Sequence, residues 1–292
     1  MSDETPKTLH HYTDSQGLLG ILQNRNFWAT DTRYLNDTQE LRHGCETMVA
    51  ALRKAADQQA PAGAEDAEAK EAAVARTTAL RFTATALARG QLFDTPPHGG
   101  AYVTCFCEGG DQLGQWRGYG ANGGGFAIGF RTDALAELAH ELKPQGDDKV
   151  TAPLPKPQRV LYHPKDLERR CATVVEKILS FGANAAPFSA GGFDAIYLCL
   201  PALAFMKHDA FQHENEWRVL LINRTNPNLK FRSGALGVIP YVEIGFPAHA
   251  VAEVVVGPGP HPELRKQAVE QLLDAEGYEN VPVRLSTVPY RP

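Results

Sequence analysis

The sequence predicts an α+β fold arranged as one domain, on the strength of three observations. Short apolar runs with strand-like patterns, such as "GAYVTCFCE" and "NEWRVLLIN", alternate with longer segments of helical periodicity. An Ala-rich and charge-rich stretch provides helix propensity but few large apolar side chains. No internal repeat or long linker marks a boundary. We therefore expect a single domain over residues 1–292 with a peripheral helical insertion at about residues 45–95.

Composition and charge are those of an ordinary soluble protein. Apolar residues make up 43% of the chain and charged residues 22%, and the net charge of −5 does not favour a generally basic nucleic-acid surface. No stretch approaches the ~18 consecutive apolar residues of a membrane span. The N-terminal "MSDETPKTLHHY" lacks the apolar core of a signal peptide. We expect a cytoplasmic protein without membrane association.

The cysteines are scattered and odd in number, which does not favour a disulfide framework. Nor do they form the two close ligand pairs of a structural zinc site, and we expect no metal. They are interpreted as reduced, mostly buried thiols: Cys45, Cys105, Cys107, Cys171 and Cys199.

The N-terminal elements follow from hydrophobic periodicity. We expect strands at Lys7–Tyr12 and Asn26–Ala29, separated by the helix "QGLLGILQN" with Ser15 as its N-cap. A further helix begins at about Asp37. Its expected apolar face comprises Leu41, Cys45, Met48 and Leu52.

Further strands are expected at "GAYVTCFCE", "GGGFAIGFRTD", "QRVLYH", "NEWRVLLIN" and "YVEIGF". The segment "DALAELAHEL" and most of residues 166–206 have helical patterns. The closing "AEVVVGPGPHPELRKQAVEQLLDAEGYENVPVRLS" predicts strand, loop, helix and strand, and a crossover of this length makes the two strands parallel neighbours.

The segment "GYGANG", Gly118–Gly123, matches the dinucleotide-binding pattern G-x-G-x-x-G. That motif must follow a strand and open a helix, whereas this one follows "DQLGQWR" and precedes the strand "GFAIGF". We therefore expect a Gly-rich turn that lets the backbone approach a neighbour.

Two glutamates precede the strand "WRVLLIN". In an extended chain Glu214 and Glu216 project from the same face, while Trp217 faces the other way. Two neighbouring carboxylates are costly unless something compensates their charge. Either Arg218 and nearby basic residues neutralise them, or they face a ligand, and the residues alone leave both alternatives open.

With these blocks assembled, the chain resembles a bacterial family of uncharacterised proteins, domain of unknown function 2971. The resemblance rests on "HYTDSQGLLGIL", "FWATDTRYLNDTQEL", "TCFCEGGDQLGQWRGYG", "GFAIGF", "KHDAFQHENEWRVL" and "VPYR", in this order.

The opening strand with His11, followed by a helix ending in "GIL", is also similar to ADP-ribosyltransferases of the DNA-modifying type. That resemblance implies a split β-sheet core and a late catalytic glutamate. The middle "VTCFC" departs from the usual Ser-Thr-Ser. The implied catalytic residues are Glu216, its helper Glu214, and His11. The implied NAD-binding residues are His11, Tyr12, Thr13, Tyr34, Asn36, Asp37, Trp116, Arg117 and Tyr119.

The function implied is cleavage of the nicotinamide–ribose bond of NAD, with transfer of ADP-ribose to a nucleic acid or protein, as in a toxin or anti-phage effector. Bond cleavage develops positive charge on the ribose, which a positioned carboxylate stabilises without a metal. Water as the acceptor would make the protein an NAD glycohydrolase.

Two other classes of function are compatible with the sequence. One is a non-catalytic regulatory module that binds a nucleotide. The other is a metal-dependent nuclease-like effector that uses Glu214, Glu216, Asp37 and Glu40 around a divalent ion.

Overall fold

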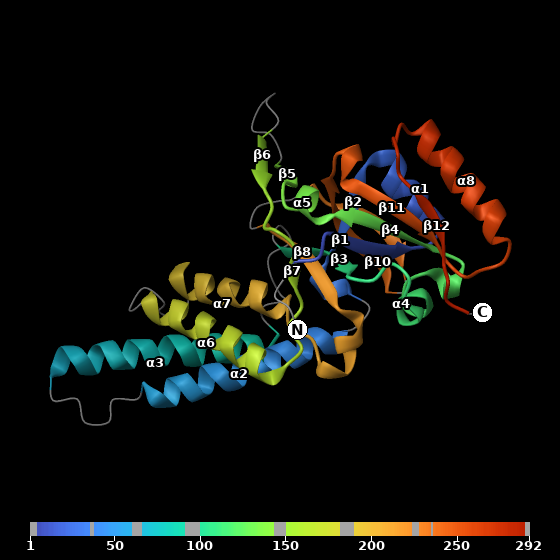
Figure 1. Cartoon of the computed structure of the whole chain (residues 1–292). Coiled ribbons are helices and arrows are strands. Elements are labelled where there is room, and N and C mark those ends of the chain that lie inside the picture. The colour runs from blue at the N-terminus through green and yellow to red at the C-terminus, as the bar shows by residue number, and fades with distance from the viewer. Residues whose placement is uncertain are drawn as a thin grey trace.

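A large mixed β-sheet organises the described part of the chain (Figure 1). The computed structural model describes residues 5–35, 38–59, 66–90, 100–142, 150–181, 190–223, 228–234 and 236–289. The helices are α1 Ser15–Asn24, α2 Thr38–Gln58, α3 Ala67–Ala88, α4 Leu113–Gly118, α5 Thr132–Leu135, α6 Pro164–Ser180, α7 Ala190–Leu203 and α8 Pro262–Ala275. The strands are β1 Thr8–Thr13, β2 Asn26–Asp31, β3 Gly100–Cys107, β4 Phe126–Arg131, β5 Ala139–Leu142, β6 Val150–Pro153, β7 Gln158–Arg159, β8 Glu216–Asn223, β9 Lys230–Gly234, β10 Gly237–Gly245, β11 Val251–Val256 and β12 Val283–Leu285.

Strand β3 is the branching point of the sheet. The main path runs β12-β11-β4-β1-β3-β2-β10-β9, and β8 pairs with β3 along its whole length. Strands β1 and β2 share the other edge of β3, because β1 meets it at Cys107 and β2 meets it at Tyr102 and Val103. Residues 104–106 of β3 pair with neither strand, so the sheet is split at this point.

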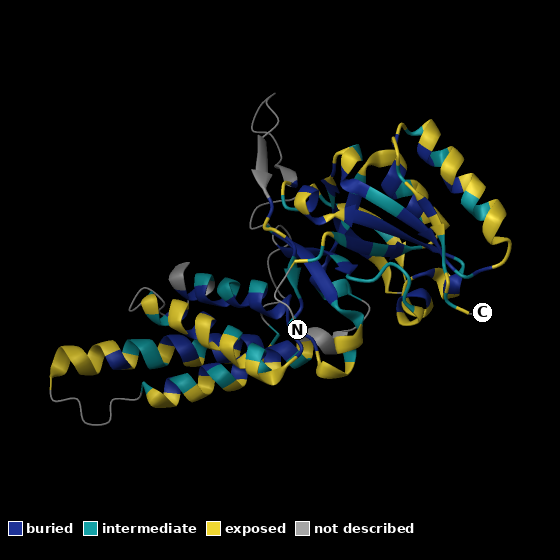
Figure 2. Ribbon diagram, viewed as in Figure 1, coloured by how far each residue is buried: buried dark blue, intermediate teal, exposed yellow. Residues whose placement is uncertain are grey.

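Two hydrophobic cores lie on opposite faces of β3 and β8. Val103 and Leu220 pack into a cluster with α2, α3, α6 and α7, which form a helical layer at one side of the sheet (Figure 1). Phe106 of β3 and Val219 of β8 pack into a second cluster on the other face, with α1 and α8. Strands β3 and β8 are accordingly almost wholly buried (Figure 2). This alternation is the period-2 pattern of a sheet buried on both faces.

The expected α+β class is confirmed, as are the main strands and the parallel pairing of β11 with β12. Two local predictions are wrong. Asp14, not Ser15, caps α1, because its Oδ1 accepts from the Gly17 N–H at 2.7 Å. The segment "DALAELAHEL" is helical only to Leu135 and then forms β5, since pairing with β6 overrides its helix propensity.

The Ala-rich stretch differs along its length. Residues 66–72 of α3 are exposed, whereas Leu80 and Leu87 are buried in the core against α6 and α7 (Figure 2). The insertion expected at residues 45–95 is thus solvated at its outer end and part of the core at its inner end.

The Gly-rich turn brings backbone segments close together, as expected. It lies between α4 and β4, and a Cβ at Gly125 would come within 2.2 Å of the Thr13 carbonyl oxygen. The five cysteines, all within the described residues, form no disulfide. Among the described helices, none combines the length and apolar character needed to cross a bilayer.

Candidate active site

A polar cavity of about 120 Å³ lies where the split in the sheet meets the helical layer. It is bounded by residues of β1, β3 and β8, by α4 and by the segment that follows α7. The lining residues are His10, His11, Tyr12, Leu35, Cys105, Phe106, Cys107, Gln115, Tyr119, Lys207, Glu214, Glu216 and Arg218.

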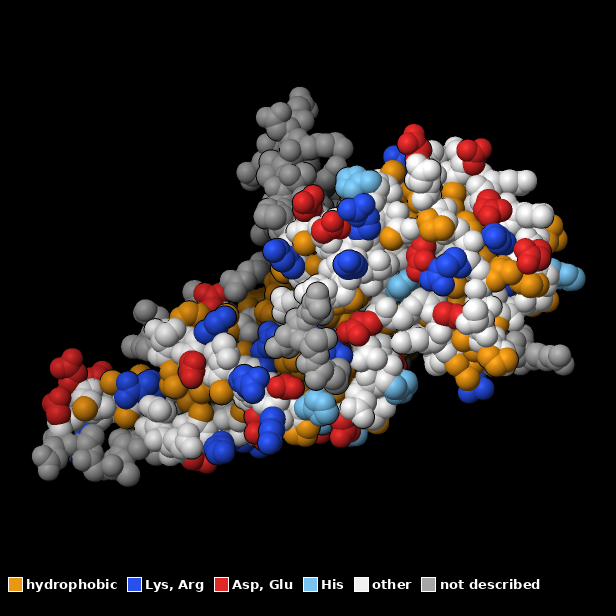
Figure 3. Space-filling model, in the orientation of Figure 1, with side chains coloured by type: hydrophobic (Ala, Val, Ile, Leu, Met, Phe, Trp, Pro, Cys, Tyr) orange, Lys and Arg blue, Asp and Glu red, His pale blue; other side chains and the backbone are white. Residues whose placement is uncertain are grey.

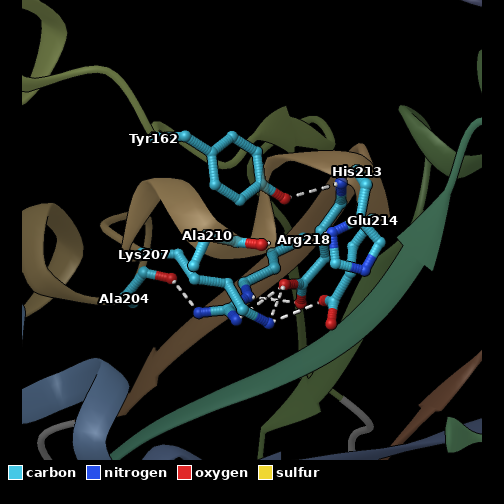
Figure 4. A network of polar contacts seen from close by, with 8 residues as sticks. Tyr162, Ala204, Lys207, Ala210, His213, Glu214 and Arg218 are labelled. Atoms are coloured by element: carbon cyan, nitrogen blue, oxygen red, sulfur yellow. Dashed lines mark hydrogen bonds and ion pairs between the residues drawn. The ribbon is translucent and has the colours of Figure 1, made fainter. Parts of the chain in front are cut away.

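Four charged side chains form a buried network at one wall of this cavity (Figure 4). Arg218 donates two hydrogen bonds to Glu216, from Nε to Oε1 at 2.7 Å and from Nη2 to Oε2 at 2.9 Å. Lys207 Nζ donates to Glu214 Oε2 at 2.7 Å and to Glu216 Oε2 at 3.3 Å. Two cations therefore face two carboxylates.

Local backbone structure brings the two carboxylates together. Glu214 ends the short 3-10 helix η4, Asp209–Glu214, and Asn215 takes a left-handed conformation with φ of 44° before β8 begins at Glu216. Glu214 and Glu216 thus converge as expected, although through a turn rather than through alternation along one strand. Gln212, two residues before Glu214, is exposed.

Main-chain contacts hold this network against the helical layer. Arg218 Nη1 donates to the Ala204 carbonyl at 2.6 Å, and the Glu216 N–H donates to the Tyr162 hydroxyl at 3.0 Å (Figure 4). The Lys207 N–H donates to the Leu161 carbonyl at 3.0 Å. These bonds join three segments to one another: the end of α7, residues 161–162 before α6, and the start of β8.

The charges decide the ionisation of Glu216. Burial alone would raise its pKa, but the charges of Arg218 and Lys207 outweigh that effect, and the Cys105 side chain also hydrogen-bonds it. The net result lowers its pKa to about 2, so Glu216 is a carboxylate at neutral pH. The thiol of Cys107, in contrast, is buried, which raises its pKa to about 12 and makes it unreactive.

His11 occupies the split in the sheet. Its Nδ1 lies 2.8 Å from the carbonyl oxygen of Cys105, whose segment of β3 has no strand partner on that side. Burial lowers the pKa of His11, so the ring is neutral at pH 7. A carbonyl can only accept, so Nδ1 carries the proton and Nε2 is the basic nitrogen.

A larger groove of about 580 Å³ adjoins the cavity. The two share five lining residues: His11, Tyr12, Leu35, Cys105 and Tyr119. The groove continues past Thr13 and the start of α1 toward β2 and β9, where it reaches Trp28, Thr30 and Arg232. Together the cavity and groove have the volume of a site for a nucleotide-sized ligand.

The predicted site residues fall into three groups. His11, Tyr12, Tyr119, Glu214 and Glu216 line the cavity, and Thr13 lines the groove.

Trp116, Arg117 and Tyr34 are not among the residues that line either space. Trp116 is buried beneath Tyr12 and donates its Nε1–H to Asp111, while Arg117 is exposed. Asn36 and Asp37 lie outside the described residues.

Sequence reasoning missed Lys207 and Cys105 as members of the site. Lys207 is only 2% exposed, and its signal in the sequence is a lone lysine directly after the apolar "LPALAFM". A lysine so placed requires a buried anionic partner. Within the part of the chain that the structure describes, no three His, Cys, Asp or Glu side chains group as metal ligands.

A comparison with models of protein families places part of the chain near a known family. The search of curated proteins found no match, and the search of solved structures found none. A sequence model of the family described as "Protein of unknown function (DUF2971)" matches residues 115–219, the segment from α4 to β8 that carries Tyr119 and the whole charged network. This match supports the resemblance to that family.

Proposed function

We propose that the cavity and groove bind NAD and that the protein cleaves the nicotinamide–ribose bond, transferring ADP-ribose to a nucleic acid or protein. One observation carries the proposal. His11 and Tyr119 share a single cavity with the Glu214–Glu216 pair, although these residues are far apart in the sequence. Polar groups that converge in this way on one cavity are typical of an active site.

The chemistry explains the need for these groups. When the bond breaks, its electron pair leaves with nicotinamide and positive charge develops on the ribose. A carboxylate that hydrogen-bonds the ribose 2′-hydroxyl stabilises that charge most strongly in the transition state. The acceptor then attacks C1 of the ribose and loses a proton. Nε2 of the neutral His11 accepts hydrogen bonds from ribose hydroxyls, and Tyr119 stacks on the nicotinamide.

The assignment of Glu216 as the catalytic carboxylate, with Glu214 as its helper, stays a prediction. The geometry favours the reverse order. Both Glu216 oxygens are engaged by Arg218, whereas the Glu214 side chain is the more exposed, at 12% against 8%. In the reversed assignment Glu214 contacts the ribose and Glu216 positions Lys207.

The test is incubation with NAD, with and without cellular RNA, DNA and protein, followed by detection of free nicotinamide and labelled acceptor. The variants Glu214→Gln and Glu216→Gln remove one charge each and keep side-chain size. The variant of the catalytic carboxylate should be slower by on the order of 10²-fold with its fold retained. Glu46→Gln is a matched control, because Glu46 is exposed and pairs with Arg42 on the helix surface.

If neither Gln variant alters nicotinamide release, the charged network is structural and the proposal is wrong. Release that requires added magnesium or manganese, and is lost in EDTA, would instead support the metal-dependent nuclease-like class. Growth arrest on expression in bacteria, relieved by the catalytic Gln substitution, would support the proposed role as a toxin or anti-phage effector.

A second candidate is a non-catalytic module that binds a nucleotide in the same groove. The engagement of Glu216 by Arg218 and Lys207 favours it, because a satisfied carboxylate needs no ligand. Saturable NAD binding without nicotinamide release would identify this function.

A further inference from the structure

An arginine reaches into the groove at the end remote from the charged network. Arg232 lies on β9, which pairs with β10, and β10 in turn pairs with β2. Its Nη2 donates to Thr30 Oγ1 on β2 at 3.2 Å, so the guanidinium extends back across β10 toward the middle of the sheet. Thr30 and Arg232 both line the groove.

This guanidinium lacks a counter-charge among the described residues. Arg232 forms no ion pair there, and its Nε is buried without a hydrogen-bond partner. Lys230, two residues earlier on the same strand, pairs with Glu243 at 2.6 Å. A buried donor without a partner costs free energy, so a group that supplies an acceptor is favoured at this position.

We propose that Arg232, held in place by Thr30, binds the diphosphate of a nucleotide in the groove. The guanidinium fork matches phosphate oxygens. The inference rests on the proposed function for the position of the ligand, with its nicotinamide–ribose end in the cavity and its diphosphate at Arg232. Asp14 also lines the groove, but its carboxylate caps helix α1 by accepting a hydrogen bond from the Gly17 N–H.

The experiment compares ADP and adenosine, which differ only by the diphosphate, in calorimetric titrations of the whole protein. The parent should bind ADP more tightly than adenosine. Arg232→Gln should weaken ADP binding by roughly tenfold or more, as expected for lost charge-assisted hydrogen bonds, with adenosine binding unchanged. Lys230→Gln, the matched control on the same strand, should keep the parent affinities.

Thr30→Val keeps the test decisive if Arg232→Gln does not fold. The substitution keeps the shape of the side chain and removes the hydroxyl that accepts from Arg232 Nη2. With its guanidinium no longer held in place, the variant should bind ADP several-fold more weakly than the parent, within the range of one hydrogen bond.

Equal binding of ADP and adenosine by the parent, or parent-like ADP affinity in Arg232→Gln, overturns the inference. If Arg232→Gln does not fold, parent-like ADP affinity in Thr30→Val overturns the inference instead. Failure of the proposed function has a different signature. In that case NAD is not cleaved, but the preference for ADP over adenosine remains and still depends on Arg232.

Discussion

The buried cation Lys207 offers a direct test of the charged network. Lys207→Met keeps an unbranched side chain of similar length and removes the charge that contacts Glu214 and Glu216. Removing one partner of a buried ion pair costs about 3–5 kcal/mol, because the other charge stays buried without compensation. Arg218 remains bound to Glu216 and Glu214 is partly exposed, so we expect the lower end, about 3 kcal/mol.

The loss of stability should depend on pH in a defined direction. The folded-state pKa of Glu216 lies below its ordinary value of 4.5, so its contribution is present above about pH 4.5 and is lost as the pH falls toward 2. Without Lys207 this carboxylate is less favoured in the folded state, and acid removes less stability from the variant. The stability difference between parent and variant should be widest near pH 7 and should narrow below pH 4.5.

Urea unfolding of both proteins at several pH values between 3.5 and 7 measures this difference. Lys230→Met is the control, because its pair with Glu243 is exposed and surface pairs contribute at most about 1 kcal/mol. A stability difference that is the same at every pH would refute the electrostatic argument and assign the effect to packing. A loss of stability in Lys207→Met that is smaller than the loss in Lys230→Met would show that Lys207 does not compensate the charge of the two carboxylates.

Three further predictions concern the frame of the site. Asp14→Ala removes the cap of α1 and should lower the free energy of unfolding by about 1 kcal/mol; an unchanged thermal midpoint would contradict the capping role. Gly125→Ala should lower the free energy of unfolding by roughly 1–3 kcal/mol, because the added Cβ would clash with the Thr13 carbonyl oxygen. An unchanged melting temperature would show that the backbone of the turn shifts to accommodate the Cβ. Replacing residues 57–72 with a short Gly-Ser linker should preserve the fold, because residues 66–72 of α3 are exposed, whereas loss of soluble expression would place this segment in an interface.

The sequence predicted those features that depend on local pattern. Strand alternation located β3 and β8. The pairing of Glu216 with Arg218 was one of the two alternatives that their proximity in the chain left open. The sequence did not predict features that depend on pairing between segments far apart in the chain. The branching of the sheet at β3 joins strands that are far apart in sequence, and β9 was not predicted at all.

The same reasoning explains what the sequence predicted of the site. His11 was named because the opening strand resembles that of ADP-ribosyltransferases, and the two glutamates because they directly precede the apolar strand "WRVLLIN". Lys207 was not, because its burial depends on where α7 ends relative to β8. Trp116 was assigned to the pocket from its aromatic, polar neighbourhood, yet its ring fills the core under Tyr12.

The surface in the view of Figure 3 carries acidic and basic side chains intermixed, so its pairs are solvent-screened and individually weak. The buried charged network has a different consequence for unfolding. Lys207 and the Ala204 carbonyl belong to the segment after α7, whereas Glu216 and Arg218 belong to β8. Separation of the helical layer from the sheet would therefore leave charged side chains on both sides without their partners. The two cores should melt as one cooperative unit, with equal calorimetric and van't Hoff enthalpies, despite lying on opposite faces of the sheet.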